Sequence, residues 1–223
     1  MHPHGYLGFS HLYNILLNPP ALLNLPLRFI TIPINFCIPV WRDLVLSYGV
    51  ISASYKSCEY ALQHRTSVGI VVGGAAESLY AGTNNATLVL KHRYGFIKLA
   101  LQTGSDIIPV YSFGENRMYR RWFFDNPFLR RVQSYILRTF GFTLPLVHGS
   151  FSSLLLLPYR QPIVTVVGVP IQVHQNSHPQ AHDIEKLHAL YCQRLTDLYY
   201  KYATVLYRTD PPPLLLTSSR HLM

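Results

Sequence analysis

The chain has 223 residues, enough for one sizeable domain and too few for two comfortable ones. Hydrophobic residues make up 49% of it, which excludes an intrinsically disordered chain, whereas charged residues make up only 13%, which predicts apolar side chains on the surface. The net charge of +9 favours anionic partners, whether nucleic acid, an anionic membrane surface or an anionic cofactor.

The first part of the chain is apolar but rich in proline. Between His2 and Trp41 the only Lys, Arg, Asp or Glu is Arg28. The run is interrupted by Pro19, Pro20, Pro26, Pro33 and Pro39. Because proline breaks a helix, no unbroken span of about 18 residues fits here. The sequence therefore predicts a buried or interfacial segment rather than a membrane-spanning one.

The first half of the chain alternates helical and extended patterns. Residues 6–17 predict a helix, and residues 28–40 an extended segment in which Pro33 argues against a central strand. Residues 41–48 predict a short helix that ends at a glycine. Residues 68–74, "VGIVVGG", are a continuous apolar run stopped by two glycines, which predicts a parallel strand buried on both faces.

The second half continues the alternation. A helix is predicted over 95–104, with Gly104 as its stop, followed by strands over 105–114 and 161–171. Residues 183–203 predict a long amphipathic helix. Its apolar stripe consists of Ile184, Leu187, Leu190, Tyr191, Leu195 and Leu198. Alternating strands and helices predict an α/β fold, and residues 208–223 predict a poorly ordered tail.

The motif "HPHG" at residues 2–5 suits acyl transfer. Proline extends the backbone before it, so that His2 and His4 lie on one side, and Gly5 allows a tight turn into the next helix. An imidazole beside the free N–H groups of a helix N-terminus is suited to stabilising an oxyanion. The alternatives are structural histidines or a metal site, and no H-E-x-x-H or paired cysteines supply further metal ligands.

A second motif, "VVGGAAESL" at residues 71–79, ends a predicted strand. Its Gly73 and Gly74 let a substrate approach the backbone, and Glu77 is placed to orient a histidine. The alternative is a plain strand-to-helix turn with Glu77 favouring the helix N-terminus. The chain has no G-x-S-x-G elbow and no glycine-rich phosphate loop of the two common types, so these chemistries lack support.

Four segments carry a family resemblance. In order and spacing, "HPHG", "VVGGAAESL", "HRYGFIKLALQTGSDIIPVYSFGEN" and "PIVTVVGVPI" resemble the successive signatures of the diacylglycerol O-acyltransferase type 2 family, which also includes monoacylglycerol and wax-alcohol acyltransferases. The resemblance reaches about Tyr207. It implies a glycerolipid-acyltransferase-like α/β fold, with a mixed, largely parallel sheet flanked by helices, and an acyltransferase domain over 1–207. The family's membrane hairpin and leading strand precede its "HPHG", so the sequence is expected to be N-terminally truncated.

The same resemblance implies a set of site residues. His4 matches the general base for the glyceride hydroxyl, with His2 shaping the same corner. The wider phospholipid acyltransferases place an aspartate four residues after this histidine, where the chain has Gly8, so Glu77 is our hypothesis for the orienting carboxylate. The implied substrate-binding residues are Gly5, Gly73, Gly74, Arg93, Gly95, Phe96, Lys98, Glu115 and Asn116.

The resemblance also implies the substrates. Acyl-CoA is the donor and co-substrate, with no cofactor and no metal expected, and its phosphates suit Arg93 and Lys98. The alternative for both cations is ordinary charge flanking a helix. The phospholipid enzymes hold the acceptor phosphate with an arginine where this chain has Tyr55, so an uncharged acceptor is expected. Diacylglycerol is preferred, with monoacylglycerol or a fatty alcohol as the alternatives.

The region 115–142 interleaves arginines with aromatic residues. This composition suits an interfacial membrane helix or single-stranded nucleic acid, and the resemblance favours the membrane. The expected location is the cytosolic face of the endoplasmic reticulum membrane or a lipid droplet. The contrasting function is that of an inactive fragment that keeps only membrane or partner binding.

Overall fold

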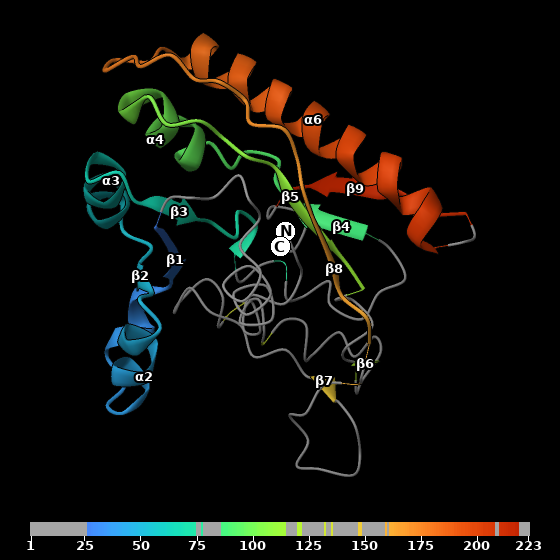
Figure 1. Ribbon diagram of the computed structural model, residues 1–223, viewed down its shortest axis with the longest axis horizontal. Coiled ribbons are helices and arrows are strands. Elements are labelled where there is room, and N and C mark those ends of the chain that lie inside the picture. The colour runs from blue at the N-terminus through green and yellow to red at the C-terminus, as the bar shows by residue number, and fades with distance from the viewer. Residues whose placement is uncertain are drawn as a thin grey trace.

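The computed structural model describes residues 26–74, 77, 86–114, 120–121, 132, 135, 147–148, 159, 161–207 and 210–218. Within them, helices and strands are interspersed along the chain and helices lie beside parallel strands (Figure 1). The strands form one three-stranded parallel sheet, one parallel pair and two antiparallel pairs. The predicted α/β class with parallel sheets flanked by helices is confirmed, although the described strands form separate small sheets instead of one mixed sheet.

The three-stranded sheet is built around β1 (Leu27–Thr31). This strand lies between β2 (Ile51–Ser52) and β3 (Ser67–Gly69), and both neighbours run parallel to it. The prediction that proline would keep this segment out of a central position is wrong. The strand ends before Pro33, which instead begins the 3-10 helix η1 (Pro33–Phe36), where its missing N–H costs nothing.

Two short helices connect the strands of this sheet. The predicted helix is α2 (Trp41–Ser47), and Gly49 follows it with a φ of +70°, a conformation that favours glycine. The second helix, α3 (Tyr55–Gln63), is not among the predicted elements. The Ser54 side chain accepts a hydrogen bond of 3.3 Å from the Ser57 N–H and so caps the start of α3.

The predicted strand over 68–74 is shorter and less buried than expected. Pairing stops at Gly69, and the valines and isoleucine that follow are only half-buried. The chain instead turns at Gly74, whose N–H donates to the Val71 carbonyl at 3.1 Å and whose φ is +58°. Gly73 and Gly74 therefore lie in a turn beyond the sheet and do not end a long strand.

A second parallel pair lies at the centre of the molecule. It consists of β4 (Ala86–Val89), which is buried along its whole length, and β9 (Leu214–Thr217). The interpretation of the C-terminal residues as a poorly ordered tail is therefore wrong for β9. The Tyr199 hydroxyl donates to the Pro212 carbonyl at 2.6 Å and the Leu214 N–H donates to the Tyr200 hydroxyl at 3.3 Å, so the segment before β9 is held by the preceding helix.

The two remaining predicted strands pair with each other. They are β5 (Val110–Phe113) and β8 (Val164–Val167), and they run antiparallel. Gly114 ends β5 with a φ of +94°, and a side chain there would collide with the carbonyl of Pro162. Both the backbone angle and the space require glycine at this position of the "FGEN" segment.

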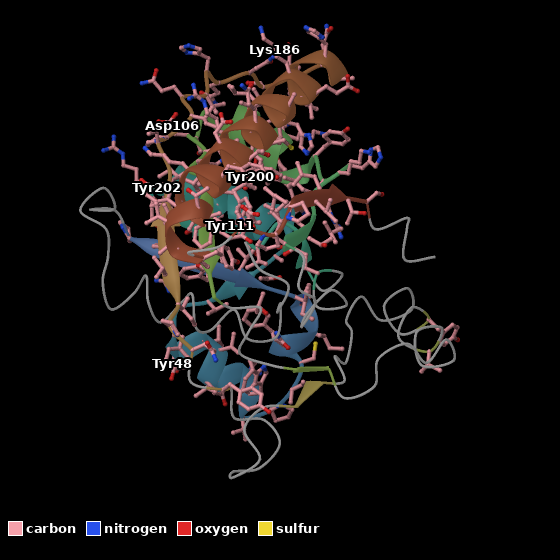
Figure 2. The ribbon with its side chains drawn as sticks, turned by 90° about the vertical axis from the view of Figure 1, so that its right-hand side faces the viewer. Tyr48, Asp106, Tyr111, Lys186, Tyr200 and Tyr202 are labelled. Atoms are coloured by element: carbon pink, nitrogen blue, oxygen red, sulfur yellow. The ribbon has the colours of Figure 1, made fainter. Side chains whose placement is uncertain are left out.

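Helix α6 (Ala181–Tyr207) covers α4 (Gly95–Thr103) and β5 (Figure 1). Figure 2 shows Tyr111 of β5 beneath Tyr200 and Tyr202 of this helix. Burial confirms most of the predicted stripe, namely Leu187, Tyr191, Leu195 and Leu198. The prediction that Leu190 belongs to the buried stripe is wrong, because this residue lies to the side of the stripe and is 37% exposed.

Little of the basic aromatic region is described. Its residues Arg120–Arg121 form β6, which pairs antiparallel with β7 (Val147–His148). Apart from Val132 and Tyr135, which are exposed, the rest of the predicted interfacial helix lies outside the described residues, as does the predicted helix over 6–17. In the part of the chain that the structure describes, none of the helices combines the length and apolar character needed to cross a bilayer.

Candidate functional site

Seven of the predicted site residues are described, and they lie on two neighbouring segments. These residues are Gly73, Gly74, Glu77, Arg93, Gly95, Phe96 and Lys98. The first three follow β3, and the others follow β4 in the loop 90–94 and the first turn of α4. The predicted residues His2, His4, Gly5, Glu115 and Asn116 lie outside the described residues.

Glu77 is a buried carboxylate that joins these two segments. Its side chain is only 1% exposed, and its Oε1 accepts a hydrogen bond of 3.0 Å from the Val89 N–H at the end of β4. The carboxyl group lies directly over Gly73, where any Cβ would overlap it. Gly73 is therefore glycine because the acid of the same motif occupies the space of a side chain.

Arg93 completes this junction from the other side. Its Nη2 donates to the Gly73 carbonyl at 3.4 Å, so it contacts the turn on which the Glu77 side chain rests. Its Nε is buried and has no hydrogen-bond partner among the residues that the structure describes. Gly73 and Glu77 belong to one motif and Arg93 to the next, 20 positions after Gly73, and the fold brings the two motifs together.

The loop 90–94 is fixed by backbone bonds to β9. The N–H groups of Leu90 and Lys91 both donate to the Thr217 carbonyl, at 3.1 and 3.0 Å. Within the loop, the Arg93 N–H donates to the Leu90 carbonyl at 3.0 Å, and His92 has a φ of +68°. A non-glycine residue in this conformation is uncommon, which marks a loop whose shape is held by its surroundings.

The first turn of α4 is open and positive. A Cβ on Gly95 would meet no atom within 4 Å, so packing does not require glycine there. The turn contains no acidic residue and presents the exposed Lys98, beside N–H groups that carry the positive end of the helix dipole. This arrangement favours the close approach of an anionic group.

Phe96 faces the opposite way. Its ring packs edge-on against Tyr191 of α6, with 5.0 Å between ring centroids. This contact anchors α4 to α6, and the substrate-binding role of Phe96 stays a prediction.

Two buried polar residues of α6 lie near the site, of which the sequence placed Tyr191 on the apolar stripe without a polar role and did not single out His188. Burial raises the pKa of the Tyr191 phenol, and the nearby Cys192 and Glu77 add to the shift, so the Tyr191 side chain lies within the electrostatic reach of the site. His188 is also buried, and burial lowers the pKa of its imidazole. Helical spacing offered a signal, because His188 falls between Leu187 and Tyr191 on the predicted stripe.

Comparison with known proteins assigns the chain to a family. The sequence profile of the diacylglycerol acyltransferase family matches residues 1–211. The chain belongs to the diacylglycerol acyltransferase family. The resemblance carried by the four sequence motifs is thereby confirmed.

Curated members of the diacylglycerol acyltransferase family align over most of the chain. Diacylglycerol O-acyltransferase 2A of Umbelopsis ramanniana is 40% identical over 220 residues, which cover 92% of this chain and 61% of that protein. Human 2-acylglycerol O-acyltransferase 1 is 38% identical over 211 residues, covering 89% of this chain and 62% of its own length. Human diacylglycerol O-acyltransferase 2 is 36% identical over 215 residues, covering 91% and 55%.

The chain spans about 60% of the length of these curated relatives. No solved structure matches it. In the described residues of this diacylglycerol acyltransferase family member, no group of three or more His, Cys, Asp or Glu side chains is placed to hold a metal ion.

Proposed function

We propose that the chain transfers a fatty acyl group from acyl-CoA to the free hydroxyl of diacylglycerol and forms triacylglycerol. The observation that carries this proposal is the family match over residues 1–211. The fold adds support, because it brings Arg93 of one family motif to Gly73 and Glu77 of another at one junction.

His4 is the proposed general base. A neutral imidazole takes the proton of the acceptor hydroxyl as its oxygen attacks the thioester carbonyl, and coenzyme A leaves as the thiol after taking up a proton. General base catalysis of this kind contributes a factor of about 10² to 10⁴ in rate. No covalent enzyme intermediate is needed.

Glu77 is the proposed orienting carboxylate for His4. Support comes from its burial and from the bond between Oε1 and the Val89 N–H, which hold the carboxylate in one position. A fixed negative charge favours one tautomer of a neighbouring imidazole and stabilises its protonated form. Glu77→Gln keeps the shape and removes the charge, and we expect kcat to fall by about two orders of magnitude with little change in KM. Unchanged turnover in this variant would contradict the role.

The first turn of α4 is the proposed binding site for the anionic part of acyl-CoA. Lys98 and Arg93 provide positive charge, and the open space beside Gly95 lets a phosphate approach the backbone N–H groups. Lys98→Ala is expected to raise the KM for acyl-CoA about fivefold without changing the KM for the acceptor.

The decisive experiment is a transfer assay in lipid vesicles. Labelled acyl-CoA and diacylglycerol are incubated with the chain as it stands, with His4→Ala, and with the control His174→Ala, whose imidazole is exposed in the segment between β8 and α6. We expect labelled triacylglycerol from the parent chain and from the control, and at most about 1% of it from His4→Ala. Equal signal from all three proteins, or none from the parent chain, would overturn the proposal and favour a chain that only binds membranes.

Monoacylglycerol is the second candidate acceptor. The observation in its favour is the 38% identity to a relative named 2-acylglycerol O-acyltransferase 1, close to the values for the diacylglycerol enzymes. Supplying diacylglycerol, monoacylglycerol and a fatty alcohol in equal amounts in one reaction tests the preference. A kcat/KM higher for monoacylglycerol than for diacylglycerol would reverse the assignment.

A membrane surface is the proposed partner of the segment 34–48. This segment exposes apolar side chains on η1, α2 and the turn between them, including Val40 at 81% and Leu46 at 52% exposure. Figure 2 places Tyr48 of this segment at the opposite end of the molecule from Lys186 of α6. The chain carries a charge of +9, which complements an anionic lipid surface, and apolar acceptors reside in membranes.

Vesicle flotation tests this surface. The double variant Leu44→Ser and Leu46→Ser is expected to bind vesicles containing anionic lipid about tenfold more weakly, because two apolar side chains no longer enter the lipid. The control is Tyr60→Ser, which removes an aromatic side chain of α3 that is also exposed. Equal weakening in both proteins would contradict a specific surface. Fractionation of cells between endoplasmic reticulum and lipid droplets tests the proposed location.

A further inference from the structure

His188 of α6 contacts the loop 90–94, which also bonds to β9. Its Nε2 lies 3.2 Å from the Leu90 carbonyl oxygen, in a buried contact between residues 98 positions apart. A carbonyl oxygen only accepts hydrogen bonds, so this contact assigns the hydrogen of the ring to Nε2. The other ring nitrogen, Nδ1, lies 3.8 Å from the Cys192 Sγ on the same helix and is left as an acceptor.

The same imidazole contacts the far end of the loop. Its ring packs edge-on against Tyr94, with 4.8 Å between ring centroids. His188 therefore holds both ends of the loop, through a hydrogen bond at Leu90 and a ring contact at Tyr94. Arg93 lies between these two points.

The Leu90 carbonyl is the shared point of this arrangement. It accepts one hydrogen bond from His188 and a second, at 3.0 Å, from the Arg93 N–H. The direction of the carbonyl thus sets where the Arg93 backbone lies, and the Arg93 guanidinium in turn reaches the Gly73 carbonyl. A chain of contacts runs from the C-terminal helix to the glycine turn of the site.

We propose that His188 is a positioning residue, which fixes the loop 90–94 so that Arg93 is oriented for the anionic part of the acyl donor. The proposal rests on the proposed function, since it assigns the loop to the donor. It differs from a packing role, because the hydrogen bond to Leu90 should matter as much as the volume of the ring. Burial favours the neutral form of the ring.

Two substitutions separate the hydrogen bond from the volume. His188→Phe keeps an aromatic ring against Tyr94 but cannot donate to Leu90, whereas His188→Gln keeps a donor at a similar distance from the backbone. The matched control is His182→Phe, an exposed histidine of the first turn of the same helix. Melting temperatures are measured for all variants, and kinetics are compared only among those that remain folded at the assay temperature.

We expect His188→Phe to raise the KM for acyl-CoA about tenfold, while the KM for the acceptor changes less than about twofold, because the Leu90 carbonyl loses one of its two donors and no longer fixes the loop. His188→Gln should recover most of the loss, and His182→Phe should match the parent chain. An unchanged donor KM in His188→Phe overturns the proposal. Equal changes in both KM values, or no recovery in His188→Gln, also overturn it and indicate packing alone.

Amide hydrogen exchange supplies a readout that does not need turnover. In His188→Phe the amide of Arg93 should exchange at least about tenfold faster, while amides in the middle of α4 keep their rates. His188→Gln should restore the slower rate. Absence of turnover in every protein would contradict the proposed function, whereas an unchanged Arg93 exchange rate in His188→Phe would contradict the positioning role itself.

Discussion

The loop 90–94 and the segment 34–48 reverse what their compositions would suggest. The loop, "LKHRY", is polar and basic, yet its groups are bonded to β9, to α6 and to the turn at Gly73. The segment 34–48 is mostly apolar, yet many of its large side chains are exposed. In the loop, the backbone groups and the Arg93 guanidinium are bonded within the protein, although the Lys91 and His92 side chains are exposed, and in the segment, apolar groups face outward.

This difference separates two kinds of partner. A loop whose groups are already bonded inside the protein can hold a small polar ligand in a fixed geometry, because little ordering is left to do on binding. A cluster of exposed apolar side chains gains free energy only when another apolar surface covers it. The comparison therefore favours a donor-binding role for the loop and a lipid-binding role for the segment.

The largest effect should come from removing β9, which holds the loop. Ending the chain after Asp210 removes the partner of β4 and the Thr217 carbonyl that accepts two N–H groups of the loop. We expect the free energy of unfolding to fall by at least about 3 kcal/mol, since the strand pair is lost together with two half-buried leucines that pack against the core. Urea denaturation measures this change. The control ends after Ser218 and keeps β9, and an equal loss in both would show that β9 is not the cause.

A smaller loss is expected from filling the space over Gly73. Gly73→Ala must displace the Glu77 carboxyl, which breaks its bond to the Val89 N–H, and should cost about 1–3 kcal/mol of stability. Gly95→Ala is the matched change, because its Cβ meets no atom and should leave stability unchanged or raise it by up to about 1 kcal/mol. Thermal denaturation compares the two. Equal stability in both variants would contradict the placement of Glu77.

Lowering the pH should weaken the loop through His188. The folded state lowers the pKa of this imidazole from its ordinary value of 6.5, so the unfolded chain binds a proton that the folded chain resists. Stability should therefore fall as the pH drops through 6.5 and until the lower folded pKa is passed.

The surroundings of the ring allow a controlled test of this pH effect. The titratable groups near the ring are Tyr94 and His92 from the loop and Cys192 from α6. None of these three groups is a carboxylate. Urea denaturation from pH 7.5 to about pH 5 should give a smaller fall in His188→Phe than in the parent chain. Identical pH profiles for the two proteins would exclude His188 as the source.

The smallest effect on stability should come from the segment 34–48. The double variant Leu44→Ser and Leu46→Ser changes side chains that are already exposed, so the free energy of unfolding should stay within about 0.5 kcal/mol. Together with weaker vesicle binding, this result would separate the surface from the folded core. A loss above about 2 kcal/mol would mean that the two leucines serve the core instead.

Much of the local structure could be predicted from the sequence. The pattern of apolar residues placed α4 and α6, and Gly104 ends α4 in the left-handed conformation that glycine favours. The interpretation of residues 214–217 as part of a poorly ordered tail was wrong, because a proline-rich, apolar segment has no periodicity that distinguishes a strand from a tail. The prediction for Leu190 was wrong because a stripe defined by spacing alone is wider than the surface that α6 buries.

The candidate site also contains residues that the sequence identified and one that it did not. The motifs identified Gly73, Glu77 and Arg93, because their residue types and order are those of the family. They did not identify His188, which lies in a helix that the motifs do not include. Its hydrogen bond to Leu90 spans 98 positions of the chain, a distance over which sequence patterns carry no geometric information.

The sequence by itself determined the helices α2, α4 and α6, the strands β5 and β8, most of the buried face of α6, and the family of the chain. These properties follow from local periodicity, from glycine and proline, and from ordered motifs. The tertiary structure alone decided that β9 pairs with β4, that Glu77 lies over Gly73, and that His188 meets the loop. The physical reason is that an apolar face or a polar side chain specifies the kind of partner it needs, whereas only the packing of the whole chain selects which partner it meets.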